Sequence, residues 1–217
     1  QANQRRKYLR ETFQGIRLFN EAYPEAHTRV YLHTQLRRGG EQELDLMLAE
    51  DGIEHLTRCV DQYALSMGSI SEEQIAKIFS VADCVMDCCL EGYGYSHVQS
   101  QAVGVPCVTL NEGPGLELIK YGAAVPVHHD DYTGLLVKPV PHPGSIAQAL
   151  ETIYKAGPGK GTEGVEWVKQ NLSWDKIAGQ WIDLIDEVME IRETYSMYIP
   201  APGPSLRRRA KQIIELH

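Results

Sequence analysis

Apolar and polar positions along the chain follow two different periods, and segments of the two kinds alternate. Residues 6–23 place large apolar side chains at helical spacing, and Pro24 follows where a helix would end. Residues 30–34 predict a short buried strand. The alternation continues, with helices predicted at about 44–49, 71–82, 96–104, 116–121, 145–156 and 163–170 and from Ser173, and strands at about 59–65, 84–86, 105–110, 123–127 and 135–137.

This succession of helices and strands indicates the fold class. Strands joined through helices favour a parallel sheet with helices on both of its faces. We therefore expect an α/β protein with a Rossmann-like, doubly wound parallel sheet and extra helices toward its C-terminus. Sheets of this kind bind ligands at the carboxyl ends of their strands, so a polar or glycine-rich segment at such an end is a candidate functional site.

The clearest helix start along the chain lies at Ser71. Ser71 and Gln74 have the spacing of a capping box, in which each side chain accepts a hydrogen bond from the other residue's backbone N–H. In the last long helix, Trp174 and Trp181 stand at helical spacing and are expected in the core. After Tyr195 the chain becomes rich in proline, so residues 1–194 are predicted to form one domain and residues 195–217 a stiff linker with a final helix.

The composition narrows the classes of function. The chain is 43% hydrophobic and 23% charged, as is usual for a soluble globular protein, and its net charge of −8 argues against a nucleic-acid partner. It contains no run of about 18 apolar residues and no visible signal segment. The five cysteines include no C-x-x-C pair, so we expect reduced core thiols, a cytoplasmic location and no zinc site.

One segment combines a strand end, glycines and a helix start. The predicted strand at 84–86 runs into a loop that contains Gly92 and Gly94, and the loop leads into the helix that begins near Ser96. Free N–H groups and the positive end of the helix dipole make such a start a seat for an anion, most naturally a pyrophosphate. Glu91 precedes the glycines and can accept hydrogen bonds from sugar hydroxyls, and Gln99 follows on the first turns of the helix.

This segment resembles the E-G-F-G-L-x-x-x-E-A-x-A-x-G-x-P signature of retaining glycosyltransferases with two Rossmann-like lobes, the GT-B fold, and more narrowly their large family four. The resemblance extends to a Gly-x-Pro step at 104–106, a Gly-Leu-Leu-Val-x-Pro step at 134–139 and a Leu-Ser-Trp-x-x-Ile-Ala helix start at 172–178. These motifs stand in the family's order over about residues 4–190, which is more specific than a single glycine motif.

The resemblance implies a role for each matching residue. Glu91 would hold hydroxyls of the donor sugar and, with Lys7 and Arg6 at the diphosphate, would carry catalysis. The remaining donor-binding positions would be the backbone at Gly92, Tyr93, Gly94 and Tyr95, the hydroxyl of Ser96 at the diphosphate, Gln99 at the ribose, and a loop beside the nucleobase that contains Gly68 and Ile70.

The sequence departs from the signature in two ways. Gln99 stands where the family has a second glutamate, so a ribose contact would lack the negative charge, and Tyr93 and Tyr95 replace Phe and Leu. The implied reaction is retaining hexosyl transfer from UDP- or GDP-hexose through an oxocarbenium-like state. Positive charge would stabilise the leaving diphosphate. No metal is expected because the chain has no D-x-D motif at a strand end, and no cofactor is expected because the nucleotide sugar is a substrate.

The resemblance also implies partners and leaves alternatives open. The acceptor would bind an N-terminal lobe that is missing here, so the fragment alone is expected to be inactive, and peripheral membrane association of the full-length enzyme is a further expectation. The main alternative is a non-catalytic scaffolding lobe derived from a glycosyltransferase. An epimerase, an inverting transferase or a flavodoxin-like domain fits the motifs less well. We expect His97 to be an ordinary helix residue.

Overall fold

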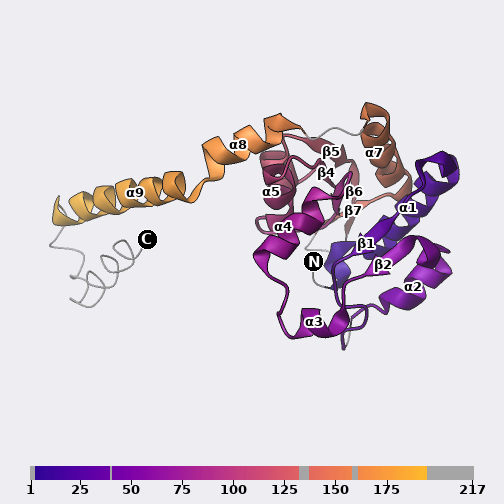
Figure 1. The fold of residues 1–217 in the computed structure, drawn as a ribbon. Helices are drawn as coiled ribbons and strands as arrows, with labels where there is room; N and C mark the ends of the chain where they lie inside the picture. Colours follow the sequence, from indigo (N-terminus) through magenta and orange to yellow (C-terminus); the bar gives the residue numbers. More distant parts are fainter. Residues whose placement is uncertain (1–2, 40, 132–136, 158–160, 195–217) are drawn as a thin grey trace. The chain divides into compact units, whose positions relative to one another are not determined.

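The computed structural model describes residues 3–39, 41–131, 137–157 and 161–194 (Figure 1). The chain divides into two compact units, Gln1–Lys169 and Gln170–His217. The predicted linker and helix at 195–217 lie outside the described residues. In the part of the chain that the structure describes, no helix is both long and apolar enough to cross a membrane.

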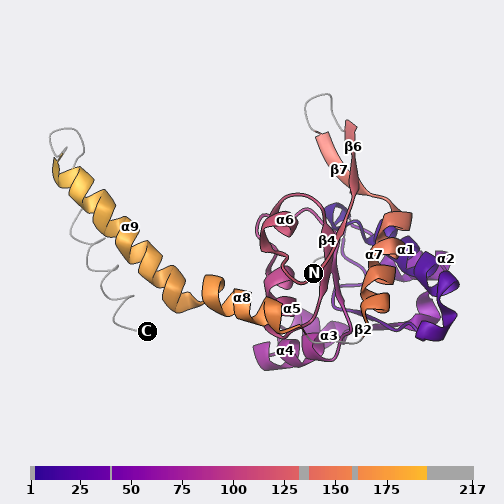
Figure 2. The same cartoon turned by 90° about the horizontal axis from the view of Figure 1, so that it is seen from above.

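The first unit is an α/β structure built on parallel strands. Strands β3 (Val85–Asp87), β4 (Cys107–Leu110) and β5 (Gly122–Val125) form one parallel sheet, and β1 (Val30–Leu32) pairs in parallel with β2 (Thr57–Cys59). This confirms the predicted fold class, although the strands hydrogen-bond as two groups. Figure 2 shows a third pair, antiparallel strands β6 (Val127–Asp131) and β7 (Val137–Pro141), extending away from the parallel strands.

Helices cover both sides of the parallel strands, as expected for a Rossmann-like unit. Figures 1 and 2 show α1 (Leu9–Ala22), α2 (Leu44–Glu50) and α7 (Pro143–Ala156) on one side, and α4 (Glu72–Ser80) and α5 (Tyr95–Ala102) on the other. The shorter helices α3 (Gln62–Ser66) and α6 (Pro114–Leu118) occupy connections. Gly15 lets α1 approach α7 closely, because an added Cβ would lie 2.5 Å from the Ile146 side chain.

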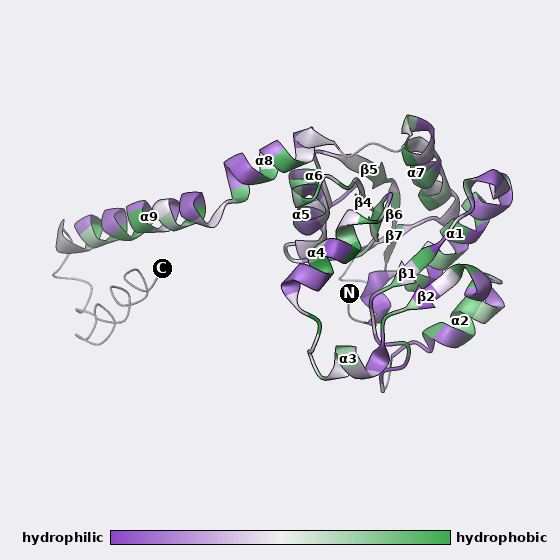
Figure 3. Cartoon of the chain, viewed as in Figure 1, coloured by the Kyte–Doolittle hydropathy of each residue, from purple (hydrophilic) through white to green (hydrophobic). Residues whose placement is uncertain are grey.

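The core of the first unit lies between the strands and α1, α2 and α7. Strand β4 is buried along its whole length, which is typical of a central parallel strand. Figure 3 shows apolar residues on β4 and on parts of the helices that flank it. The best-covered apolar side chains come from several elements: Phe13, Leu44, Ile53, Val108, Leu110, Val125 and Ile146.

Two helix starts show how local hydrogen bonds set the boundaries. The capping box at Ser71 is confirmed, with Ser71 Oγ 3.2 Å from Gln74 N and Gln74 Oε1 2.8 Å from Ser71 N. The strand predicted at 59–65 is wrong beyond Cys59, because Asp61 caps α3 by accepting a hydrogen bond from Ala64 N at 2.7 Å. A side-chain cap therefore outweighs the apolar pattern of this segment.

Helix α8 (Thr162–Leu172) leads into the long helix α9 (Trp174–Thr194). Trp174 and Trp181 are 82% and 60% exposed, so their predicted core position is wrong in this structure. Helical spacing identifies an apolar face correctly, but it does not show which element covers that face.

Candidate functional site

The candidate site begins where strand β3 ends. Asp87 is the last residue of β3, and the loop that follows leads to Tyr95, the first residue of α5. Gly94 occupies the N-cap position of α5 with a φ of 87°, and no side chain caps the helix. The start of α5 therefore offers backbone N–H groups and the positive end of the helix dipole to a ligand.

The two loop glycines differ in what surrounds them. A Cβ added to Gly94 would lie 2.3 Å from His97 Nδ1, and the positive φ would strain any other residue there. A Cβ added to Gly92 would have no neighbour within 4 Å. Gly94 is thus required by the protein's own packing, whereas Gly92 borders open space.

A cleft of about 360 Å³ opens in front of this loop and the first turns of α5. Its lining consists of polar, charged and aromatic residues, all of which the sequence had singled out: Lys7, Glu91, Tyr93, Gly94, Tyr95, Ser96 and Gln99. A second hollow of about 330 Å³ lies between β5 and α7 and is lined only by small or uncharged residues. The first cleft is therefore the one equipped for polar chemistry.

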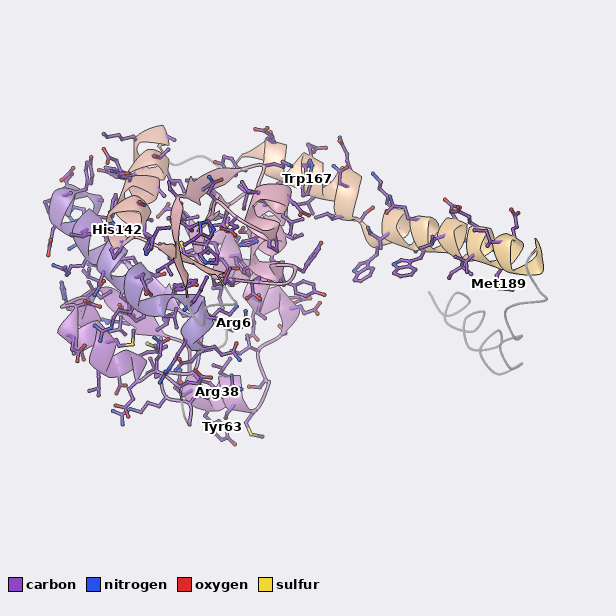
Figure 4. All side chains as sticks on the ribbon, turned by 180° about the vertical axis from the view of Figure 1, so that it is seen from behind. Arg6, Arg38, Tyr63, His142, Trp167 and Met189 are labelled. Carbon is purple, nitrogen blue, oxygen red and sulfur yellow. The ribbon has the colours of Figure 1, made fainter. Side chains whose placement is uncertain are left out.

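Two cations meet the carboxylate of Glu91. They come from Arg6 and Lys7, on the short 3-10 turn (Arg5–Lys7) before α1; Arg6 is labelled in Figure 4. Lys7, only 4% exposed, forms an ion pair with Glu91 Oε1, and Arg6 Nη1 lies 3.2 Å from Glu91 Oε2. Arg6 also donates a hydrogen bond to the backbone oxygen of Leu90. Ion pairs thus connect the 3-10 turn before α1 to the loop after β3.

Glu91 keeps room for further partners despite these contacts. Its side chain is 21% exposed. A carboxylate has about four acceptor positions, and the two cations use one on each oxygen. Glu91 can therefore accept hydrogen bonds from ligand hydroxyls while Lys7 and Arg6 remain beside it.

Asp87, fully buried below the cleft, joins several elements. Its Oδ1 accepts a hydrogen bond from Cys89 Sγ at 2.5 Å, and its Oδ2 accepts one from the Ser96 hydroxyl. Asp87 therefore links the end of β3 to the loop and to the first turn of α5. Asp87 was not among the residues predicted from the sequence, although its position at the carboxyl end of a parallel strand was an available signal.

His97 also lies below the cleft, with 1% of its side chain exposed. Its Nε2 is 2.9 Å from Thr109 Oγ1 on β4 and 3.4 Å from Asp87 Oδ2. Its Nδ1, toward Gly94, has no hydrogen-bond partner among the described residues. His97 is thus a buried residue that connects α5 to the sheet. The helical spacing of residues in the sequence could not reveal this contact.

A metal-ligand arrangement overlaps the same site. Ligand atoms of Asp87, Cys89 and Glu91 all lie within 4.8 Å of one another. The ammonium of Lys7 already lies among them, paired with Glu91 and 3.6 Å from Cys89 Sγ. Burial, followed by the charge of Asp87, raises the pKa of the Cys89 thiol to about 12. A metal would have to compete with Lys7 and bind a thiol that resists ionisation.

The structure does not bring every predicted residue to the cleft. Gly68 and Ile70 lie on the connection between α3 and α4, and neither lines the cleft. Gly68 has a φ of 62° and open space where a Cβ would lie. Their predicted place beside a nucleobase stays a prediction.

Solved structures with a similar fold include GT-B glycosyltransferases. The pneumococcal O-GlcNAc transferase GtfA, in complex with UDP and GlcNAc, matches with a TM-score of 0.60, 13% identity and 87% of this chain covered. Anabaena HepE in complex with UDP matches with a TM-score of 0.63, 16% identity and 86% of this chain covered. Sucrose-phosphate synthase from Thermosynechococcus elongatus matches with a TM-score of 0.61, 20% identity and 86% of this chain covered. The chain has the α/β fold of a GT-B Rossmann-like lobe.

The same comparisons limit what is known of the whole protein. This chain spans 35% of the GtfA chain, 47% of HepE and 43% of sucrose-phosphate synthase. No protein-family model matches the sequence, and no curated protein is found to be similar to it. The likeness therefore concerns the fold, and activity has to be argued from the site.

Proposed function

We propose that this chain, with the fold of one GT-B lobe, is the C-terminal, donor-binding lobe of a retaining glycosyltransferase and binds a nucleoside-diphosphate hexose. The observation that carries the proposal is the cleft itself. It brings the uncapped start of α5 together with Lys7, Glu91 and Gln99, three polar side chains from three segments of the chain. A helix start that can bind an anion, next to side chains that can accept hydrogen bonds from hydroxyls, fits a diphosphate joined to a sugar.

The diphosphate would bind at the first turn of α5. Backbone N–H groups there, the hydroxyl of Ser96 and the ammonium of Lys7 supply donors and positive charge. Ser96 donates to Asp87 in the structure, so its hydroxyl would have to turn from Asp87 to donate a hydrogen bond to the phosphate. Lys7 would then divide its interactions between Glu91 and the phosphate.

The rest of the donor would extend on both sides of the diphosphate. The hexose would place hydroxyls on Glu91, and the ribose would bond to Gln99, which lies one turn into α5. The nucleobase would lie toward the loop that contains Gly68 and Ile70. The HepE and GtfA structures contain UDP, which makes UDP the first nucleotide to test, with GDP as its rival.

The chemistry that this arrangement supports is electrostatic. As the bond between the hexose and the diphosphate breaks, negative charge grows on the leaving phosphate. Lys7, which lines the cleft, and the start of α5 would stabilise that charge without a metal or a cofactor. Arg6 is not part of the cleft lining and would add positive charge from its position beside Glu91. Retention would follow from attack on the same face of an oxocarbenium-like sugar. The acceptor would bind the missing lobe, so the chain alone would transfer slowly or not at all.

A nucleotide-binding panel tests the proposal. Titration calorimetry of the chain with UDP, GDP and ADP should give saturable binding with a preference for one base. Lys7→Met should weaken that binding about 10-fold, since a charge-assisted contact is lost, whereas the exposed Lys77→Met should leave it unchanged. A non-catalytic scaffolding lobe, which is the alternative, would bind none of the three nucleotides. A cytoplasmic location and peripheral membrane association of the full-length enzyme belong to the same proposal.

A further inference from the structure

Two tyrosines line the cleft and remain largely in water. Tyr93 and Tyr95 are 43% and 70% exposed, and both belong to the lining. Aromatic side chains supply large contact areas when covered, so a pair left open at the mouth of a polar cleft indicates a binding surface. The polar contacts that we assigned to the donor make no use of these rings.

The two rings are held in a fixed relation. Their centroids are 5.2 Å apart and their planes meet at 61°, an edge-to-face arrangement. Tyr93 and Tyr95 flank Gly94, whose positive φ turns the chain between them. Edge-to-face packing uses the edge of one ring, so ring face remains available to a third group. Two rings that already pack against each other lose less side-chain freedom on binding than two separate rings would.

The neighbours of the rings indicate which part of a ligand they would meet. The charged side chains of Glu91 and Lys7 line the same cleft. A pyranose ring has hydroxyls around its edge and C–H groups on its faces, so it needs polar partners beside an apolar surface. A nucleobase would also stack on ring faces, but in the proposed donor pose it lies toward the loop that contains Gly68 and Ile70, whereas the hexose lies beside Glu91. The combination of aromatic faces with Glu91 and Lys7 fits a sugar ring.

We propose that Tyr93 and Tyr95 form an aromatic platform that packs against the C–H face of the donor's hexose. The platform is a subsite for a neutral pyranose, and it rests on the proposed function because it needs a donor bound in the cleft. The rings act through dispersion and through the negative potential of their faces toward C–H groups. Their hydroxyls are not needed for this contact.

The test compares a nucleotide with its sugar conjugate. Affinities for UDP and UDP-glucose are measured by calorimetry on the wild-type chain and on Tyr93→Ala, Tyr95→Ala, Tyr93→Phe and Tyr95→Phe, with GDP and GDP-mannose in parallel. Tyr63→Ala is the matched control: Tyr63 on α3 is 74% exposed and outside the cleft lining, and Figure 4 shows it pointing outward at the edge of the ribbon. Thermal unfolding checks that each variant is folded.

We expect both alanine variants to bind the sugar nucleotide about 3- to 10-fold more weakly and the free nucleotide as the wild type does. Both phenylalanine variants and Tyr63→Ala should match the wild type. Equal losses of affinity for UDP and UDP-glucose would mean that the rings contact the nucleoside or support the loop, which would contradict the platform. Alanine variants with wild-type affinity for UDP-glucose would also contradict it. If the wild type binds no nucleotide or sugar nucleotide, the proposed function fails and the platform fails with it.

Discussion

At the scale of single residues, Lys7 is a cation held almost entirely out of water against Glu91. Removing one member of a buried ion pair leaves the other without compensation, at a cost of about 3–5 kcal/mol when both are buried. Glu91 is partly exposed and keeps Arg6, which reduces this cost. We expect Lys7→Met to lower the free energy of unfolding by about 1–2 kcal/mol in urea titrations. Adding Glu91→Gln to Lys7→Met should restore part of the lost stability. If the losses of the two single variants simply add, the ion pair between Lys7 and Glu91 is contradicted.

Gln99 offers a second test at this scale. A neutral amide that bonds to a ribose hydroxyl contributes about 1 kcal/mol, so Gln99→Leu should weaken UDP binding about 5-fold. Gln99→Glu restores the carboxylate that the family signature carries and should bind UDP at least as tightly as the wild type does. The measurement is calorimetry with UDP on the wild type, Gln99→Leu and Gln99→Glu. Wild-type affinity in Gln99→Leu would show that Gln99 does not contact the nucleotide.

Single residues also show what the sequence could and could not reveal. Glu91 and Gln99 follow from a motif and its spacing, and Lys7 follows from the family resemblance; the structure brings all three to one cleft. Asp87 and His97 lie beneath the cleft, and their partners Ser96 and Thr109 are identified only after the chain has folded. Local patterns identify residues that face a ligand better than those that hold the ligand-binding backbone in place.

At the scale of elements, the loop before α5 depends on one glycine more than on the other. Gly94→Ala would strain a positive φ and push a methyl group into the His97 ring, so we expect a loss of about 1–3 kcal/mol of stability. Gly92→Ala meets open space and should lose less than about 0.5 kcal/mol. Urea titrations of the pair provide the comparison, and equal effects would mean that the loop conformation is described wrongly.

Four cysteines in or beside strands β3 and β4 give the stability of the fold a pH dependence. Burial raises the pKa of Cys84 and Cys89 to about 12, and it raises the pKa of Cys88 and Cys107 well above the usual value near 9. Above pH 9 the unfolded chain loses thiol protons that the folded chain retains. The folded state then binds more protons, so the free energy of unfolding falls as pH rises from about 9 toward 12.

The test compares pH slopes. Urea titrations between pH 7 and pH 10 should show stability falling at the alkaline end. The fall should be shallower in a Cys88→Ala/Cys107→Ala variant, whatever its absolute stability, because lysines and tyrosines titrate equally in both proteins. Parallel slopes would show that these thiols are not the source.

Element types were predicted better than element ends. Alternating periods were sufficient for the α/β class, and the Ser71 capping box was read directly from four residues. The segment after Cys59 was misassigned because Asp61 begins a helix there. An apolar run does not distinguish a strand from a short helix without its cap.

At the scale of the whole molecule, the chain has the fold of a GT-B Rossmann-like lobe and spans less than half of the length of GtfA, HepE and sucrose-phosphate synthase. Identities of 13–20% to these proteins show that the fold survives where most side chains differ. The apolar face of α9 was predicted, but the exposure of Trp174 and Trp181 on that face was not. Coverage is a property of the assembled protein, and sequence periodicity within one helix cannot supply it.

The central claim is that a diphosphate binds at the first turn of α5. A crystal structure of the chain with UDP tests it most directly. The account predicts a phosphate oxygen within hydrogen-bond distance of backbone N–H groups at Tyr95 and Ser96, with Lys7 Nζ beside it. UDP bound in the hollow between β5 and α7, or phosphates turned away from α5, would contradict it.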